Sequence, residues 1–215
     1  MNAKVFISIL VSLSSFLLAP AQEYSKHLQK IATEKESFKS SDSPVVIQQA
    51  STYLFKQLTQ NVFPAWYGTP WDFNGISNIP KAGEIACGYF VTTTLKHVGF
   101  NLNRFKLAQQ DAATIAKNIC GTNHCQWYND MDVMISDLSS KPDGLYVLGL
   151  DYHVGFLSKE GNSIYFVHSD FYSGKVIREY ADHSESILLS ERYYLGSLTN
   201  NKEAIKRWLN NIKIY

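Results

Sequence analysis

In the first half of the chain, hydrophobic residues recur at helical spacing. Ser43-Pro44 suits the cap and first position of a helix, and the apolar residues after it predict a helix that runs to about Gln60 and ends before Pro64. The same spacing predicts further helices over residues 87–98, 107–119 and 128–139. This half of the chain is therefore expected to be mainly helical.

From Pro142 onward, the apolar residues form short runs separated by turn residues. These runs predict strands over residues 145–150, 153–158, 164–168, 176–180 and 192–198. A closing helix is expected from Thr199 or Asn200, with one apolar side formed by Ala204, Ile205, Trp208, Leu209 and Ile212. Helices followed by an antiparallel meander predict an α+β fold, with N-terminal helices packed on an antiparallel sheet and a C-terminal helix.

The N-terminal residues 1–21 predict a signal peptide. An apolar run over residues 5–18 follows a weakly basic start, and Ala19-Pro20-Ala21 has the small-residue spacing of a signal-peptidase site. The run is short for a membrane span, although an uncleaved N-terminal anchor is the alternative. The mature protein is expected to be secreted or periplasmic, without a membrane span. The polar segment 22–42 is expected to be a mobile or loosely docked arm.

Composition favours one folded domain over residues 43–215. Hydrophobic residues make up 45% of the chain and aromatic residues 13%, which is enough for a core and argues against disorder. The formal net charge is +1, so neither nucleic acid nor an anionic membrane surface is suggested as a partner. Composition leaves the oligomeric state open.

An exported protein with three cysteines has one left over. Cys120 and Cys125 are close enough in sequence to close a small disulfide loop, which leaves Cys87 as the unpaired thiol. No metal site is expected around His124, because the Cys120–Cys125 stretch lacks a second ligand pair. Cys87 begins a predicted helix, where free N–H groups and the helix dipole favour the thiolate of a nucleophile. A small buried cysteine that fills a gap is the alternative.

Two histidines are brought together by the predicted hairpin. A two-residue turn at Glu160-Gly161 would place His153 opposite His168, whereas a turn at Gly161-Asn162 would place His153 opposite Asp170. Either register gives His153 a polar partner that can orient it. A pair of structural histidines on a half-exposed sheet edge is the alternative.

The stretch Trp66–Gly75 interleaves aromatic residues with Gly, Pro and Asn. Such a composition predicts an ordered loop whose rings wall a cleft or anchor the loop to the core. We expect Tyr67, Trp71 and Asp72 to contribute to substrate binding.

Four motifs together resemble the NlpC-type cell-wall peptidases, papain-like cysteine enzymes with a circularly permuted core. The loop Gly68–Gly75 is similar to the family's opening loop, and Ala86–Val91 occupies the place of its nucleophile motif. His153-Val154-Gly155-Phe156 matches the strand that carries the base, and Phe166–Ser169 matches the strand that ends in a third polar residue. The resemblance covers roughly residues 66–169.

The resemblance implies amide hydrolysis through a thioester, without a metal or organic cofactor. Cys87 would be the nucleophile, His153 the base and His168 the residue that orients it. The backbone N–H of Cys87 would stabilise the oxyanion, and Trp71 would donate its indole N–H or wall the site. By the same resemblance, the substrate would be a peptide of the bacterial cell wall, such as a γ-glutamyl–diamino-acid bond of a muropeptide.

The chain also departs from the family pattern. Ala86 replaces the acidic residue before the cysteine, Gly88 replaces a serine, and an insertion of about residues 101–141 is expected to shape one wall of the cleft. Two alternatives therefore stay open. One is the same fold acting as an acyltransferase or amidase on another substrate, and the other is a catalytically idle binding or inhibitory module.

Overall fold

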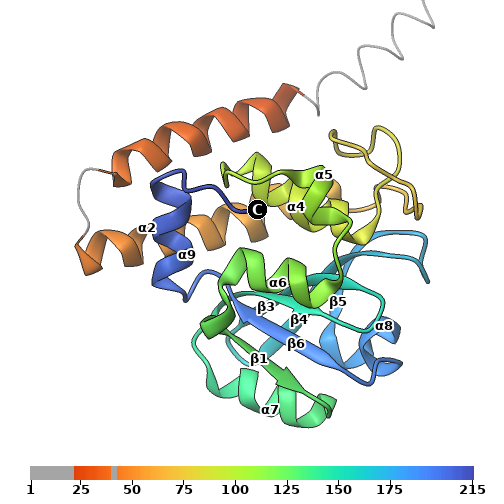
Figure 1. Ribbon diagram of the computed structural model, residues 1–215. Coiled ribbons are helices and arrows are strands. Elements are labelled where there is room, and N and C mark those ends of the chain that lie inside the picture. Colours follow the sequence, from red (N-terminus) through yellow and green to blue (C-terminus); the bar gives the residue numbers. More distant parts are fainter. Residues whose placement is uncertain (1–21, 40–42) are drawn as a thin grey trace, which may run out of the picture.

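A six-stranded antiparallel sheet forms the centre of the computed structural model, which describes residues 22–39 and 43–215 (Figure 1). The strands in spatial order are β1 (Cys125–Tyr128), β6 (Tyr193–Ser197), β2 (Gly144–Gly149), β3 (Val154–Glu160), β4 (Ser163–Asp170) and β5 (Lys175–Tyr180). All five predicted strands are present, and the α+β class is confirmed. Strand β1 was not predicted, because it is a four-residue edge strand without an alternating pattern.

Helices cover both faces of the sheet, and most of them precede strands β2–β6 in sequence. They are α2 (Pro44–Gln57), the π-helix η1 (Leu58–Val62), α3 (Phe63–Trp66), α4 (Cys87–His97), α5 (Arg104–Ala108), α6 (Ala112–Cys120), α7 (Met131–Ser140), α8 (Glu185–Leu188) and α9 (Lys202–Leu209). Two short 3₁₀ helices, η2 (Thr122–His124) and η3 (Ala181–His183), and a helix over residues 22–38 are also present. The predicted nucleophile helix is α4.

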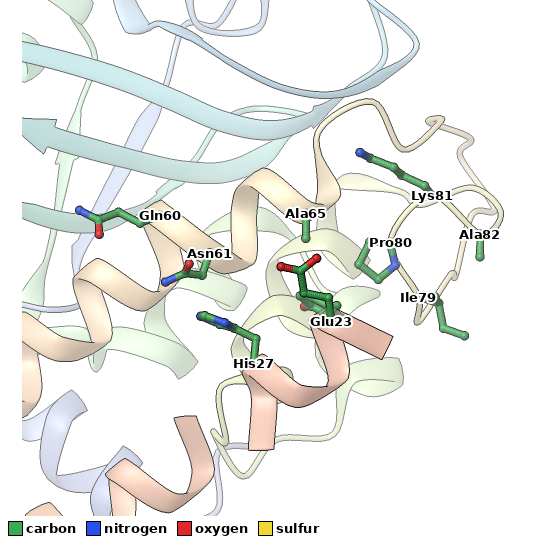
Figure 2. Close-up of a pocket in the computed structure, with 10 residues that line it drawn as sticks. Glu23, His27, Gln60, Asn61, Ala65, Ile79, Pro80, Lys81 and Ala82 are labelled. Carbon is green, nitrogen blue, oxygen red and sulfur yellow. The ribbon is translucent and has the colours of Figure 1, made fainter. Parts of the chain in front are cut away.

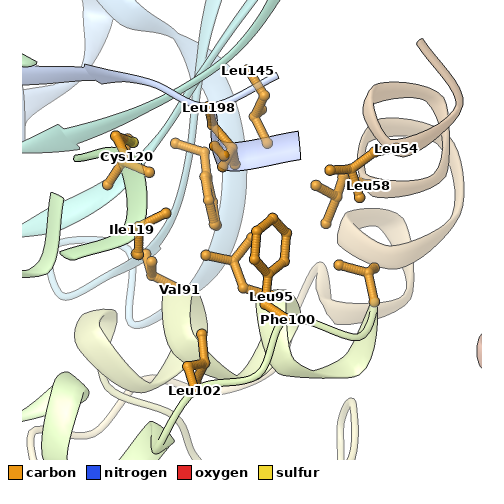
Figure 3. Close-up of a cluster of buried hydrophobic side chains, with 14 of the residues drawn as sticks. Leu54, Leu58, Val91, Leu95, Phe100, Leu102, Ile119, Cys120, Leu145 and Leu198 are labelled. Carbon is orange, nitrogen blue, oxygen red and sulfur yellow. The ribbon is translucent and has the colours of Figure 1, made fainter. Parts of the chain in front are cut away.

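Alternate residues of the strands build two hydrophobic cores, one on each face of the sheet. Leu145 and Val147 of β2 belong to the larger core with α2, α4, α6 and α9, whereas Tyr146 and Leu148 belong to a smaller core with α7 and α8. Figure 3 shows part of the larger core, in which side chains from the helices meet the sheet: Leu54, Leu58, Val91, Leu95, Phe100, Leu102, Ile119, Cys120, Leu145 and Leu198. Each fully buried aliphatic side chain contributes about 1.5–3 kcal/mol of transfer free energy.

The segment over residues 22–38 is a docked helix rather than a loosely docked arm. Ile31 is buried in the larger core, and Lys35 Nζ donates to the carbonyl oxygen of Gly99 at 2.7 Å, just beyond the C-terminal end of α4. The Tyr24 hydroxyl is hydrogen-bonded to Nδ1 of His97 at 2.9 Å. The polar composition of this segment was misleading, because a few apolar contacts and one buried lysine stem are enough to dock it. Residues 40–42 and the predicted signal peptide, 1–21, lie outside the described residues.

Pro64 does not end the helix before it. The chain continues through the π-helix η1 into α3, where Pro64 occupies the first turn. The N–H of Phe63 bonds the carbonyl oxygen of Leu58, five residues earlier. This wider turn gives the proline ring room, and its missing N–H costs little in a first turn.

Capping residues move two other helix boundaries. The helix predicted over residues 107–119 is divided, because Asp111 caps α6 by accepting from the N–H of Thr114 at 2.8 Å. The C-terminal helix begins after Asn201, whose side chain accepts from the first-turn N–H groups. Ile212 lies beyond the end of that helix and is 49% exposed, so its predicted place on the buried side was wrong. No helix among the described residues is long and apolar enough to span a membrane.

Candidate active site

The loop before α4 is held, just before the predicted nucleophile, by the loop over residues 70–75 and by the end of β4. The N–H of Ile85 donates to Pro70 O and the N–H of Ala86 donates to Gly75 O, each at 2.9 Å. Ser169, the residue after His168, donates its hydroxyl to Ile85 O at 2.6 Å. These bonds hold the start of α4 against the end of β4, so Cys87 is positioned by the same strand that carries His168.

A close approach between α4 and α5 explains why position 88 is a glycine. A Cβ atom at this position would lie 2.4 Å from the carbonyl oxygen of Ala108, at the end of α5. No ordinary side chain fits that distance, so the serine of the family motif is excluded here by packing. The absence of the serine therefore reflects the approach of α5 and carries no information about the chemistry of Cys87.

His153 and His168 are directly hydrogen-bonded, although the strand register that predicted this pair is not the one that the structure has. Nε2 of His153 lies 2.8 Å from Nδ1 of His168, and both rings are buried. The strands pair Glu160 with Ser163, which fixes the turn at Gly161-Asn162 and makes the alternative turn at Glu160-Gly161 wrong. His153 stands just before β3 begins, and its ring reaches His168 rather than Asp170.

Two further residues organise the histidine pair, and neither was predicted. Glu179 of β5 accepts from Nε2 of His168 at 3.0 Å, and the ring of Phe166 stacks on His168 with centroids 4.0 Å apart. Phe166 also meets His153 edge-on at 5.9 Å. Phe166 and Glu179 are paired across β4 and β5, so they share a face with His168. The only sequence signal for them was the period of two along their strands.

Cys87 and His153 line the same cavity. This cavity of about 520 Å³ also contains Trp71, together with Phe73, Asn74, Ile76, Ala86, Gly88, Tyr89, Ala108, Gln109, Gln110, Tyr152 and Phe171. His153 also lines two smaller hollows, and Tyr152, which is 98% exposed, borders all three. The predicted aromatic loop thus does wall a cleft at the thiol, through Trp71 and Phe73.

The other two residues expected to bind substrate do not line this cavity. The chain from Gly68 to Trp71 runs antiparallel to β5, which leaves Tyr67 beside Arg178. Burial raises the pKa of the Tyr67 hydroxyl to about 12. Asp72 accepts from the N–H of Asn74 at 2.7 Å and so stabilises the turn that presents Phe73.

Burial sets the protonation of the two central groups. It raises the pKa of the Cys87 thiol, although the backbone N–H groups of Val154, Gly88 and Cys87 itself act in the opposite direction. Burial, and secondarily the neighbouring His168, lowers the pKa of His153 well below its ordinary value. The thiolate expected from the helix start is therefore not the favoured resting form. The favoured pair is a thiol and a neutral imidazole, and no hydrogen bond joins the two among the described residues.

We expect alkylation of Cys87 by iodoacetamide to show a midpoint above the ordinary cysteine pKa of about 8.5 in the folded protein. The reason is that desolvation outweighs the N–H groups directed at the sulfur. Peptide mass spectrometry after brief alkylation across a pH series measures this residue separately from the other two cysteines. The same protein unfolded in urea supplies the control midpoint. A folded midpoint below the unfolded one would show a thiolate–imidazolium pair instead.

Cys120 and Cys125 are free thiols in this structure, and their sulfur atoms are adjacent. A Cβ added to Gly196 would lie 2.8 Å from Cys120 Sγ and 3.0 Å from Cys125 Sγ. Gly196 on β6 therefore leaves the space that both sulfurs share. The disulfide stays a prediction, and the structure places its two partners together.

A second cavity, of about 510 Å³, is separate from the thiol (Figure 2). It lies between the helix over residues 22–38, the segment from η1 to α3, and the loop that contains Ile79 to Ala82. His27 lines it, and Nε2 of its ring is hydrogen-bonded to the side-chain oxygen of Gln57 at 3.0 Å. Neither Cys87 nor His153 contributes to this cavity.

Comparison of the chain with protein-family models, with curated proteins and with solved structures gives no match. Within residues 22–39 and 43–215, no group of three or more His, Cys, Asp or Glu side chains is placed to hold a metal ion. The site offers a thiol, two linked imidazoles and a carboxylate beside an open cleft. That set can perform nucleophilic and general acid–base chemistry on a carbonyl compound.

Proposed function

We propose that this protein is an exported cysteine hydrolase that cleaves amide bonds through a Cys87–His153–His168 thioester mechanism. One observation carries the proposal: His153, bonded through Nε2 to His168, lines the same cavity as Cys87 at the start of α4. A structural histidine pair would not need to open onto a cleft that also contains a cysteine. The motif resemblance to NlpC-type peptidases supports the same assignment and a papain-like fold.

The proposed chemistry depends on which ring nitrogen of His153 is free to react with a substrate in the cavity. Because His153 Nε2 is bonded to His168, Nδ1 takes the proton from the Cys87 S–H as the sulfur attacks the substrate carbonyl carbon. The same proton then passes to the amide nitrogen, the C–N bond breaks, and an amine leaves a thioester on Cys87. Water attacks the thioester, gives its proton to Nδ1, and releases a carboxylic acid; that proton returns to the sulfur. The Cys87 N–H stabilises the oxyanion.

The shape of the cleft supports a peptide substrate. Its walls are largely aromatic and apolar and include Trp71, Phe73 and Tyr152, and its volume of about 520 Å³ lies within the usual range of ligand sites. The resemblance favours a cell-wall muropeptide among such substrates, and secretion or export to the periplasm would bring the enzyme to it. Nucleic acid is not a proposed partner.

The deciding experiment incubates the protein with purified peptidoglycan in H₂¹⁸O and identifies the products by mass spectrometry. Hydrolysis predicts a new amine end and a new carboxyl end that carries one ¹⁸O atom. Added hydroxylamine is expected to divert part of the product into a hydroxamate, since it intercepts the thioester. Both products should be absent with Cys87→Ala and unchanged with Cys125→Ala, which removes a thiol outside the cleft.

Other outcomes separate the alternatives. A hydroxamate or a transferred acyl group without ¹⁸O incorporation would replace the hydrolase by an acyltransferase that uses the same thioester. Binding of muropeptides without any new chain end, at equal level in wild type and Cys87→Ala, would contradict catalysis and favour a binding module. Identical new products from wild type and Cys87→Ala would refute the role of the thiol.

A further inference from the structure

We infer that Glu179 is a positioning residue that sets the direction of the hydrogen bonds through both histidines, so that the nitrogen of His153 facing the cleft is unprotonated. The inference rests on the proposed function, because it assigns a role within that same site. It concerns a residue outside the Cys-His-His set, one strand beyond His168 on β5.

The direction begins at the carboxylate. An ionised glutamate only accepts hydrogen bonds, so the 3.0 Å contact between Glu179 Oε1 and His168 Nε2 requires a proton on Nε2. A neutral His168 then has a bare Nδ1, which accepts from His153 Nε2 at 2.8 Å. His153 consequently holds its proton on Nε2 and presents a bare Nδ1. That is the tautomer that can remove a proton from Cys87.

A competing carboxylate is too far away and already engaged. Asp170 Oδ1 lies 3.9 Å from Nδ1 of His168, beyond hydrogen-bond distance. The Asp170 oxygens instead accept from the N–H groups of Tyr172 and Ser173 and from the hydroxyl of Ser186. Between Asp170 and Glu179, it is therefore Glu179 that decides the tautomer of His168.

The direction of these hydrogen bonds matters because both histidine rings are buried. His168 is fully buried and His153 is 6% exposed, so water has little access to replace either partner. Without the acceptor at Nε2, His168 can hold its proton on Nδ1 and donate it to His153 Nε2. His153 would then carry its own proton on Nδ1, toward the cleft, and could not act as a base. Glu179, whose side chain is 27% exposed, links this buried pair to the surface.

The test reads the tautomers directly in protein labelled with ¹⁵N-histidine. Long-range ¹H–¹⁵N correlation distinguishes a protonated Nε2 from a protonated Nδ1, and the signals are assigned with His153→Ala and His168→Ala. We expect both rings of the wild type to carry the proton on Nε2 at neutral pH. In Glu179→Met, which keeps the length of the side chain and removes the acceptor, we expect Nδ1–H forms to appear.

Kinetic measurements distinguish the role of Glu179 as a hydrogen-bond acceptor from the effects of its side-chain shape and charge. Glu179→Met is expected to lower kcat by about tenfold to 100-fold with little change in KM, as for other outer partners that orient a functional histidine. Glu179→Gln keeps an oxygen that can accept from Nε2–H, so it should retain the wild-type tautomers and most of kcat. The control is Glu160→Gln, a glutamate paired with Arg178 at 3.0 Å, which should change neither measurement.

Two results would overturn the inference. One is an Nδ1–H tautomer of His168 in the wild type, and the other is an unchanged tautomer pattern in Glu179→Met. If the wild type hydrolyses no wall peptide, the proposed function fails, whereas the NMR spectra still decide what Glu179 does.

Discussion

His153→Ala is expected to lower kcat for amide hydrolysis by a factor of about 10⁴ or more, because the enzyme loses its base and its acid together. Cys87→Ala should lower kcat by at least the same factor. The informative measurement is the double variant, assayed by the rate of new amine ends. If the two residues act as one unit, the double variant is no slower than the slower single one.

The matched control for this prediction is His124→Ala, which removes an exposed histidine in η2. It should retain wild-type kcat. Since His153 is buried, its removal also leaves a cavity, and circular dichroism melts are needed to confirm that each variant is folded at the assay temperature. Independent losses that multiply in the double variant would show that the thiol and the imidazole do not cooperate, and would contradict the mechanism.

The sheet and most helices were predictable because their signals are local. A run of apolar residues between turn residues defines a strand regardless of its neighbours, and capping residues such as Ser43 mark a helix start. The helix boundaries that failed depended on one competing local feature, such as the cap at Asp111 or the wide turn before Pro64. The docked helix over residues 22–38 depended on tertiary contacts that its polar composition does not show.

The candidate site was predictable only as far as a hairpin constrains it. A short turn limits the registers to two, and both gave His153 a polar partner. The structure has the register with the turn at Gly161-Asn162, yet the partner of His153 is His168, which the other register predicted. Glu179 was out of reach because the connection over residues 171–174 allows several registers between β4 and β5. The protonation of Cys87 was also out of reach, since burial depends on how α5 and the sheet close around the helix start.

Gly155 shows how the fold and the site depend on the same packing. A Cβ at this position would lie 2.6 Å from Cε2 of Phe166 and 2.8 Å from Cβ of His168. Continuing the β3–β4 register places Gly155 opposite His168, so the glycine in the His-Val-Gly motif is what allows the Phe166 ring to lie against the strand. Gly155 thus makes room for the ring that supports both imidazoles.

Gly155→Ala is therefore expected to destabilise the protein by about 1–3 kcal/mol, because overpacking of a rigid core outweighs other effects. The opposing gain, from restricting the unfolded chain, is only about 0.5–1 kcal/mol. Urea unfolding measures the net change. Since the new methyl group also presses on His168 Cβ, kcat should fall even at temperatures where the variant is fully folded.

Phe166→Leu provides the test of this cause, because it removes the two ring atoms nearest to the new methyl group, Cε2 and Cζ. The free energy of unfolding lost by the double variant should be smaller than the two single losses combined, by roughly 0.5–3 kcal/mol. The contact with His168 Cβ remains in the double variant, so stability should recover further than kcat. Strict additivity would mean that Gly155→Ala acts through the backbone, and a stabilised Gly155→Ala would show that the ring and the histidine move aside freely. Either result would separate the stability of the sheet from the positioning of His153, which this structure joins through Phe166.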